Sequence, residues 1–267
     1  KLKLGKRSLV FVEAPMVHWP DSMFSYCPEE ELLMPNDAFG QHYATEERFA
    51  DQVDQEALME EAKKYYANIL WPLGPVILRK IEEVVKMNIP IKMIAPSHGL
   101  IWRCDPLDIV KTYAEWAKGE VKPKAVVAYE TMWGATAKMA QEICRGIKAG
   151  GAEVKIFDIN ESDRTDIVTE MFDCKGFVIG SSTHDNDMLP NISGLLELLK
   201  GFKAKGRIAS AFGSYGWAGG AVKEIEGVFK EAGIPLAQES LSVQYVPDTE
   251  EIKRCYEFGR DFANRLK

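Results

Sequence analysis

The chain has 267 residues, of which 46% are hydrophobic and 27% are charged, so it can bury a normal core and is not expected to be disordered. It contains no apolar run of about 18 residues, so no transmembrane helix is predicted. The formal net charge of −7 argues against nucleic acid or an anionic membrane as the main partner. A chain of this length favours two domains.

The five cysteines are dispersed along the chain, and no two have the C-x-x-C spacing of thiolate zinc or iron–sulfur sites. A protein with an odd number of scattered cysteines is expected to be reduced and cytoplasmic. The sequence opens at Lys1 rather than at a methionine, so we expect the true N-terminus to lie upstream.

Residues 1–118 predict an irregular α/β arrangement. Apolar runs indicate strands at residues 9–12, 31–34 and 91–95, and helical spacing indicates helices at 56–68, 76–86 and 105–117. Residues 15–26, which contain Pro, His and Trp, predict a loop. Residues 119–123 contain Gly and Pro and predict a linker to a second domain, residues 124–267.

The second domain alternates regularly between apolar runs and helical segments. Strands are expected at residues 125–129, 152–159, 176–180, 207–213 and 238–244, and helices at 136–149, 192–199, 219–232 and 248–266, with a short polar and helical piece before the third strand. Asp248 is the expected N-cap of the last helix. This alternation predicts a parallel sheet covered on both faces. Five strands and five helices are typical of the flavodoxin-like, doubly wound α/β layout.

Three polar loops follow strands of this sheet, at the edge where open parallel sheets bind ligands. They comprise Thr131, Met132, Trp133, Gly134, Ala135 and Thr136; Ser182, Thr183, His184, Asp185, Asn186 and Asp187; and Ser214, Tyr215, Gly216, Trp217, Ala218 and Gly219. The first loop opens a helix, whose unpaired N–H groups favour a phosphate, and it lacks the lysine of a triphosphate-binding loop. The other two would contact the edge of a flat heterocycle, with Trp217 beside its face. Together the three loops predict FMN.

Each loop also has a simpler interpretation. Residues 131–136 could form only a capped helix start, and the glycines beside Trp217 only a tight turn before the next helix. The run from His184 to Asp187 could also suit a metal, although its place in a flavin-binding loop already explains it.

Two histidines and one aspartate of the first domain each lie just past a predicted strand. These residues are His18, Asp37 and His98, and two imidazoles with a carboxylate suit iron or zinc. A single loop histidine is more often structural, so the metal interpretation depends on their joint placement. Three ligands are too few for a two-metal centre.

Six segments, in this order, resemble the flavodiiron proteins, also called A-type flavoproteins. They are HWPDSM at 18–23, NDAFGQH at 36–42, YYANIL at 65–70, PSHG at 96–99, TMWGAT at 131–136 and SYGW at 214–217. The resemblance covers essentially the whole chain. It implies the C-terminal half of a metallo-β-lactamase-like αβ/βα domain with a non-haem di-iron site, followed by a flavodoxin-like domain that holds FMN.

The resemblance also implies roles and partners. His18 would ligate one of two non-haem iron ions, His98 the other, and Asp37 would bridge them, with Tyr66 near the bound gas. Such a protein reduces dioxygen to water, nitric oxide to nitrous oxide, or both, with electrons from a small redox donor such as rubredoxin or a reduced deazaflavin. A head-to-tail homodimer would bring the FMN of one chain to the irons of the other. The family's remaining iron ligands lie upstream of the segment that matches His18, so the N-terminal half of the metal domain is expected to be absent from this sequence.

Two other functions stay open on the sequence. A flavodoxin-type FMN electron carrier with a non-functional metal domain would bind flavin but would neither bind iron nor reduce a gas. A zinc hydrolase would use a metal-bound hydroxide, although hydrolysis does not need the electron source that a flavin domain supplies.

Overall fold

Residues 1–120 contain a five-stranded mixed sheet in the strand order β1-β2-β3-β4-β5. Its strands are β1 (Leu2–Leu4), β2 (Arg7–Glu13), β3 (Met23–Cys27), β4 (Leu32–Met34) and β5 (Met93–Ile94). The first four pair antiparallel, and β5 joins β4 in parallel. The computed structural model describes all 267 residues, which divide into this unit, Lys1–Glu120, and a second unit, Val121–Lys267.

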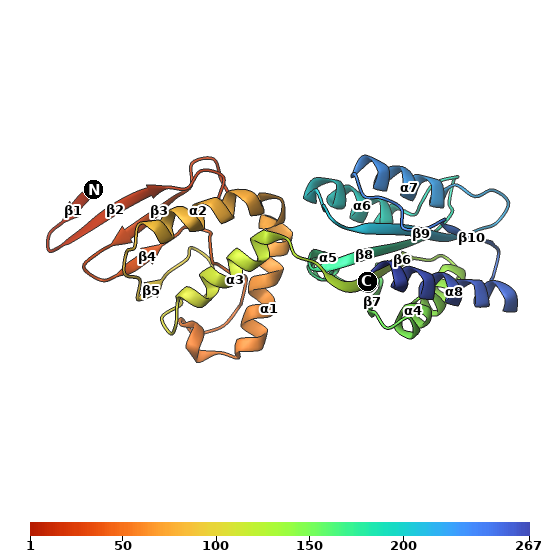
Figure 1. Cartoon of the computed structure of the whole chain (residues 1–267), viewed down its shortest axis with the longest axis horizontal. Helices are drawn as coiled ribbons and strands as arrows, with labels where there is room; N and C mark the ends of the chain where they lie inside the picture. The colour runs from red at the N-terminus through yellow and green to blue at the C-terminus, as the bar shows by residue number, and fades with distance from the viewer. The chain divides into compact units, whose positions relative to one another are not determined.

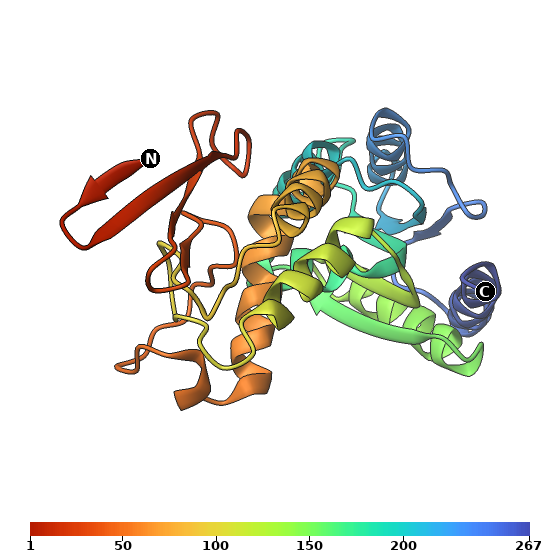
Figure 2. The same ribbon diagram turned by 60° about the vertical axis from the view of Figure 1, so that its left-hand side comes forward.

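Three α-helices complete the first unit: α1 (Gln55–Tyr65), α2 (Gly74–Lys86) and α3 (Leu107–Lys118). Short 3-10 or π-helical turns lie at Ala50–Gln52, Tyr66–Leu70 and Trp71–Leu73. α1 begins at Asp54, whose carboxylate accepts a hydrogen bond from the backbone N–H of Ala57 at 2.8 Å. The helices lie beside the β4–β5 end of the sheet, whereas β1 and β2 extend away from them (Figures 1 and 2).

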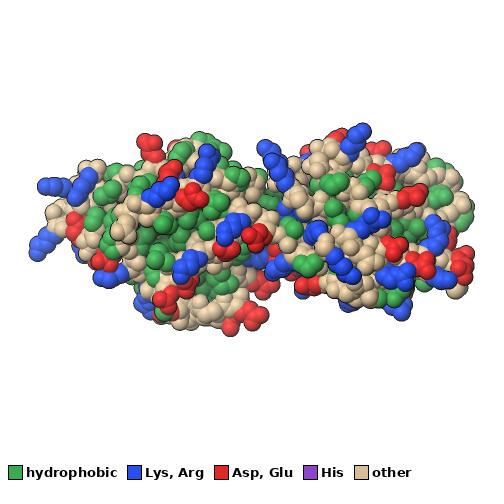
Figure 3. All heavy atoms as spheres, in the orientation of Figure 1, with side chains coloured by type: hydrophobic (Ala, Val, Ile, Leu, Met, Phe, Trp, Pro, Cys, Tyr) green, Lys and Arg blue, Asp and Glu red, His purple; other side chains and the backbone are tan.

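The two faces of this sheet differ in their exposure to solvent. Phe24, Tyr26, Leu33 and Ile94 are buried on one face. The strand register places Leu2, Phe11 and Met23 on the other face, where all three side chains are exposed. Hydrophobic side chains also gather on the surface around β4 and β5 (Figure 3). An apolar surface of this kind is typical of a region that another polypeptide covers.

The second unit is built on five parallel strands in the order β10-β9-β8-β6-β7. They are β6 (Lys122–Glu130), β7 (Glu153–Asp158), β8 (Cys174–Ser182), β9 (Ile208–Tyr215) and β10 (Leu241–Gln244). β6 and β8 are central and consist almost entirely of buried residues, which explains why their sequences are continuous apolar runs. The predicted flavodoxin-like parallel sheet is confirmed.

Five helices cover this sheet on its two faces. They are α4 (Ala135–Ala149), α5 (Arg164–Phe172), α6 (Pro190–Phe202), α7 (Ala221–Glu231) and α8 (Thr249–Arg265). α4 and α8 pack on one face, and α6 and α7 lie on the opposite one (Figure 1). Asp248 is the N-cap of α8 and forms a capping box with Glu251, as its sequence predicts. None of the helices is long and apolar enough to cross a membrane, and all five cysteines are free.

Several elements differ from the sequence predictions. β1 was not predicted, and β3 begins inside the predicted loop 15–26, where the nearby Pro and Trp hid the short alternating run Met23–Cys27. Only two residues of the predicted strand 91–95 pair as β5. The polar piece before β8 is the regular helix α5, which begins at Asp163, a side-chain N-cap.

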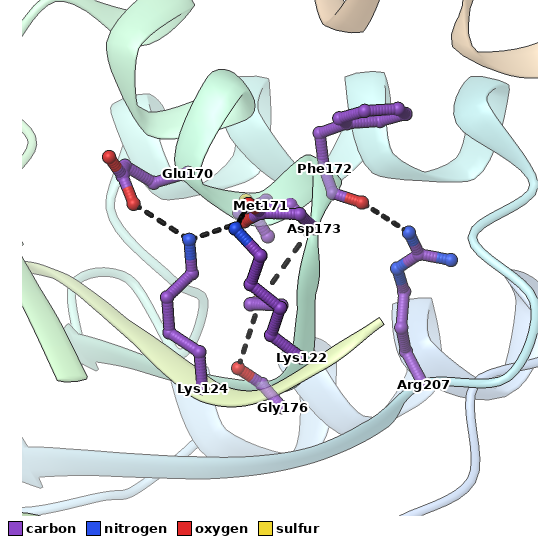
Figure 4. A network of polar contacts seen from close by, with 9 residues as sticks. Lys122, Lys124, Glu170, Met171, Phe172, Asp173, Gly176 and Arg207 are labelled. Atoms are coloured by element: carbon purple, nitrogen blue, oxygen red, sulfur yellow. Dashed lines mark hydrogen bonds and ion pairs between the residues drawn. The ribbon is translucent and has the colours of Figure 1, made fainter. Parts of the chain in front are cut away.

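Charged side chains are buried at the amino ends of β6 and β8, opposite the edge with the three polar loops (Figure 4). The ammonium group of Lys124 pairs with Glu170 at 2.9 Å and with Asp173, and Lys122 lies 3.0 Å from Asp173. Arg207 donates to two backbone carbonyls nearby. Burial disfavours the charged form of Lys124, but its hydrogen bonds to the two carboxylates outweigh this cost and raise its pKa. These contacts fix α5 against the sheet.

α4 and α8 approach each other through glycines. A Cβ atom on Gly146 of α4 would lie 2.0 Å from the backbone oxygen of Tyr256 in α8. A Cβ atom on Gly259 of α8 would lie 2.0 Å from the backbone oxygen of Ile143 in α4. The two helices therefore meet backbone to backbone, at a distance that only glycine permits.

We expect Gly146→Ala to destabilise the protein, because the added methyl group would push α8 away from α4. Overpacking of this kind costs about 1–3 kcal/mol and opposes the gain of up to about 1 kcal/mol that alanine has over glycine in a helix. Gly227→Ala in α7 is the matched control and should stabilise, since nothing lies within 4 Å of a Cβ atom added there. Chemical unfolding followed by circular dichroism measures both effects, and shifts of the same sign in the two variants would contradict this account.

Candidate flavin and metal sites

The loops that follow β6, β8, β9 and β10 line a cavity of about 680 Å³. Its lining residues are Met132, Trp133, Ala135, Ser182, Thr183, His184, Asp185, Asn186, Ser214, Tyr215, Gly216, Trp217, Ala218, Tyr245 and Val246. The predicted residues Thr131, Gly134, Thr136, Asp187 and Gly219 belong to the same loops without lining the cavity. Tyr245 and Val246 were not predicted, although they follow the last strand, where the rule for ligand position in parallel sheets also applies.

Three hydroxyl groups tie these loops together. The Oγ1 of Thr136 lies 2.9 Å from the Oγ of Ser182 and 2.9 Å from the Oγ of Ser214, and all three residues are buried. The backbone N–H of Thr183 donates to the carbonyl of Ser214 at 2.8 Å, and that of Met132 donates to the Oγ of Ser182 at 3.4 Å. Contacts within the protein therefore hold the loops in one arrangement.

At the start of α4 the Oγ1 of Thr131 accepts from the N–H of the N-cap, Gly134, at 3.1 Å, but no side chain accepts from the N–H groups of the first turn itself. Side chains accept backbone hydrogen bonds at the start of the other four: Asp163 for α5, Glu130 for α6, Thr183 for α7 and Asp248 for α8. The N-cap of α4 is Gly134, with φ 83° and nothing within 4 Å of a Cβ atom added there. Unpaired N–H groups and the partial positive charge of the helix end make this position suitable for a phosphate.

Aromatic side chains surround the mouth of the cavity. Trp133 and Trp217 are 88% and 94% exposed, and Tyr245 is also exposed. Large aromatic groups left in solvent around a cavity are typical of a binding surface, and their flat faces suit a fused heterocyclic ring. The cavity therefore fits FMN at both ends, with an anion site at α4 and aromatic faces for the ring.

The loop after β8 contains a tight turn at Asp185 and Asn186, whose φ angles are 51° and 63°. His184 and Asp187 exchange backbone hydrogen bonds of 3.0 and 2.9 Å across this turn. Gly220 allows the turn to pack closely, because a Cβ atom there would lie 1.8 Å from the backbone oxygen of Asn186. The Nδ1 of His184 lies 3.3 Å from the carboxylate of Asp185, and both side chains are exposed.

In the first unit, His18, Asp37 and His98 come together from three different loops. The Nε2 of His98 lies 3.0 Å from one carboxylate oxygen of Asp37, and the Nε2 of His18 lies 3.4 Å from the other. The carboxylate of Asp37 is mostly buried between the two imidazoles. This donor set suits iron, but the three side chains do not by themselves form a complete metal-binding group.

A chain of hydrogen bonds links these three loops. The hydroxyl of Ser97 donates to the carboxylate of Asp37 at 2.8 Å, and the backbone N–H of Ser97 donates to the carbonyl of Asn36 at 2.8 Å. The side-chain amide of Asn36 donates to the hydroxyl of Ser22 at 3.3 Å, which in turn donates to the carbonyl of Val17 at 3.0 Å. The position of the aspartate is therefore coupled to the loops that carry both histidines.

The buried side chain of Gln41 fixes the loop that follows His98. Its carbonyl oxygen accepts from the backbone N–H of Leu100 at 2.6 Å, and its amide donates to the carbonyl of the same residue at 3.3 Å. Gly99 has φ 74°, and a Cβ atom there would lie 1.5 Å from the Gln41 oxygen. Glycine is required at this position both by its backbone conformation and by the close approach.

Tyr65 lies beside this cluster. Its ring centroid is 5.9 Å from that of His98 and 4.9 Å from that of His42, and its hydroxyl is buried without a hydrogen-bond partner. Burial raises the pKa of Tyr65, and the charge of Asp37 adds to the shift. Neither Tyr65 nor His42 was predicted as a site residue, although both belong to segments that carry the family resemblance.

Tyr66, the tyrosine that the resemblance places near the bound gas, is fully buried in the π-helical turn after α1. Its ring packs against those of Tyr113 and Trp116, with centroid distances of 5.0 and 5.2 Å. Consecutive helical residues point about 100° apart, so only one of the two tyrosines can face the cluster closely. The ring contacts to His98 and His42 belong to Tyr65, and the role of Tyr66 stays a prediction.

Both units of the chain are similar to known proteins. The flavodoxin family model matches residues 127–259. The chain is 54% identical over 266 residues to a nitric oxide reductase of Moorella thermoacetica, covering 99% of this chain and 67% of that protein. It is 44% identical over 261 residues to the anaerobic nitric oxide reductase flavorubredoxin of Aeromonas hydrophila, covering 97% of this chain and 52% of that protein.

Two solved structures share this fold over nearly the whole chain. The rubredoxin oxygen:oxidoreductase from Desulfovibrio gigas matches with a TM-score of 0.94 at 34% identity, covering 99% of this chain and 67% of that one. The flavodiiron protein from Giardia intestinalis matches with a TM-score of 0.93 at 34% identity, covering 99% of this chain and 66% of that one. The chain thus spans about two thirds of the length of the Moorella protein and about half of the flavorubredoxin. With these identities and a fold shared end to end, the chain belongs to the flavodiiron proteins, a family of oxidoreductases.

Proposed function

We propose that the second unit binds FMN in the cavity at the carboxyl ends of its strands. The observation that carries this proposal is the first turn of α4, whose N–H groups have no side-chain acceptor. The N–H groups of residues 131–136 would hold the phosphate, while residues 182–187 and 214–219 would flank the isoalloxazine. Trp217 would lie beside the ring face, and the exposed Tyr245 adds a second aromatic surface at the mouth.

We propose that His18, Asp37 and His98 are ligands of a non-haem di-iron site. Asp37 would bridge the two irons, since each of its carboxylate oxygens already faces a different imidazole. A centre of two irons needs more ligands than these three residues supply. Residues 1–118 would accordingly be the C-terminal half of a metallo-β-lactamase-like domain, which the exposed apolar face of the β1–β5 sheet supports.

The proposed reaction is the reduction of nitric oxide to nitrous oxide, of dioxygen to water, or of both. When bound, FMN supplies electrons one at a time and a pair of irons binds and polarises the gas. The chain's own residues position these groups: Ser97 orients the Asp37 carboxylate, and the Gln41–Leu100 contacts hold the His98 loop. The ring of Tyr65 lies 5.9 Å from that of His98, and its buried hydroxyl, which has no hydrogen-bond partner, would donate a hydrogen bond toward the bound gas. The names of the Moorella and Desulfovibrio relatives support both substrates.

We propose that the protein works as a head-to-tail homodimer, in which the FMN of one chain faces the irons of the other. The aromatic side chains exposed around the flavin cavity are suited to such an interface. A small redox donor, such as rubredoxin or a reduced deazaflavin, would supply the electrons. The name of the Desulfovibrio relative supports rubredoxin. The expected cytoplasmic location stays a prediction.

We expect Asp37→Asn to abolish gas reduction and lower the iron content, because an amide cannot replace a bridging carboxylate. FMN content should not change, since the flavin loops do not depend on this residue. Asp51→Asn is the matched control: it removes a carboxylate of the same unit that pairs with Arg103 at 2.9 Å, away from the cluster. Iron and flavin analysis with anaerobic turnover measures these outcomes, and full turnover by Asp37→Asn would rule out the proposed bridging role.

We expect Ala135→Asp to weaken FMN binding roughly tenfold or more, because it places a negative charge at the first position of α4, where the phosphate would lie. A tenfold loss corresponds to about 1.4 kcal/mol. Binding of riboflavin should change by no more than about twofold, because riboflavin lacks the phosphate that the added charge would repel. Thr249→Asp puts the same charge at the first position of α8, outside the cavity lining, and serves as the control. Fluorescence titration of the flavin-free protein measures both affinities, and equal losses for the two flavins would exclude α4 as the phosphate site.

A further inference from the structure

Glu130 is a buried carboxylate at the end of β6, directly before the first polar loop. One of its oxygens accepts hydrogen bonds from the backbone N–H groups of Asn191 at 3.0 Å and Ile192 at 3.2 Å. Its other oxygen accepts from the side-chain amide of Asn191 at 3.0 Å. That amide also donates to the Oδ1 of Asn160, just after β7, at 2.8 Å. One carboxylate thus joins β6 to α6, and Asn191 extends the connection to the end of β7.

These contacts account for the donors at the start of α6. Leu189 is the N-cap, but it has no side chain that could accept a hydrogen bond, and Pro190 has no N–H group. Asn191 and Ile192 donate to Glu130, and Ser193 donates to the carbonyl of Leu189 at 3.1 Å. A residue more than fifty positions earlier therefore does what a local cap does in α5 and α8.

The position of this remote cap matters for the flavin. Glu130 immediately precedes Thr131, so it fixes the point at which the 131–136 loop leaves the sheet. Its partner helix α6 follows the loop after β8, whose Ser181 hydroxyl accepts from the backbone N–H of Leu189 at 2.8 Å. The carboxylate also fills the anion position at the N-terminus of α6, while the N–H groups in the first turn of α4 keep no side-chain acceptor.

We propose that Glu130 is a positioning residue for flavin recognition. By holding the phosphate-binding loop in place, it makes the site selective for FMN over riboflavin, which has no phosphate. Its contacts to α6 hold the start of the 131–136 loop so that the N–H groups of α4 can converge on the phosphate. It does not touch the ligand, since it is not among the residues that line the cavity. This role of Glu130 rests on the proposed FMN site, whose preference for a phosphorylated flavin it would determine.

Electrostatics alone predicts the opposite sign. A carboxylate near a phosphate repels it, so removing the charge of Glu130 would tighten FMN binding if the residue acted only through its charge. If it acts by positioning, removing its hydrogen bonds should weaken FMN binding and leave riboflavin binding nearly unchanged. The two accounts are therefore separated by the direction of the effect.

The test compares FMN and riboflavin binding to the flavin-free full chain by fluorescence titration. For Glu130→Ala we expect the dissociation constant for FMN to rise at least about tenfold and that for riboflavin to change less than about twofold. Glu130→Gln keeps one acceptor oxygen for Asn191 and Ile192, so it should recover part of the affinity and should fold even if the alanine variant does not. Asp163→Ala, which removes the N-cap of α5 outside the cavity, is the control for the loss of a helix cap.

Tighter FMN binding by Glu130→Gln would overturn the proposal in favour of a purely electrostatic effect. Equal weakening for both flavins, or the same pattern in Asp163→Ala, would reduce Glu130 to a contributor to stability. Unchanged affinities in both Glu130 variants would also overturn it. Failure of the unsubstituted protein to bind FMN would instead reject the proposed function, and the Glu130 variants would then add nothing to that result.

Discussion

The position of the loops at the carboxyl ends of parallel strands is the constraint on which the flavin site depends. From β6 the chain passes to β7 on one side and then to β8 on the other, so the loops that follow β6 and β8 diverge and leave a crevice between them. The register places Ser182 opposite Ser214, and the Thr136 hydroxyl reaches both. The backbone geometry of the sheet thus determines where a ligand can lie, and side-chain hydroxyls fix the loops around it.

The cluster of His18, Asp37 and His98 is assembled by a different means, because its sheet is mostly antiparallel and its strands are short. The three loops are joined by hydrogen bonds through Ser22, Asn36 and Ser97, and by the buried Gln41 against Leu100. Residues that bind nothing themselves therefore set the distance between the imidazoles and the carboxylate. This explains why motif segments such as NDAFGQH and PSHG extend beyond the ligand-type residues they contain.

Features that depend on hydrophobic periodicity or on the position of strand ends could be predicted from the sequence. The five parallel strands, the Asp248 cap and the loops of the cavity follow from apolar runs and from the rule for ligand position. Contacts between residues far apart in the sequence were not predictable. The sequence identifies Glu130 only as a residue at the end of a strand, whereas its role at α6 depends on a contact with Asn191, 61 positions later. Likewise, YYANIL identifies a helix with two tyrosines, but the orientation that brings Tyr65 rather than Tyr66 to His98 depends on packing.

Both candidate sites contain backbone that ordinary residues avoid. Of the ten non-glycine residues with positive φ, six lie in loops of these sites: Met16, Asn36, Phe39, Asp185, Asn186 and Tyr245. Each such conformation costs roughly 1–3 kcal/mol and persists only where surrounding contacts require it. The contacts that require it here are the protein's own, such as the His184–Asp187 bridge and the Asn36–Ser97 hydrogen bond. Contacts within the protein therefore support these backbone conformations, and the residues that make the contacts shape each site together with the groups that line it.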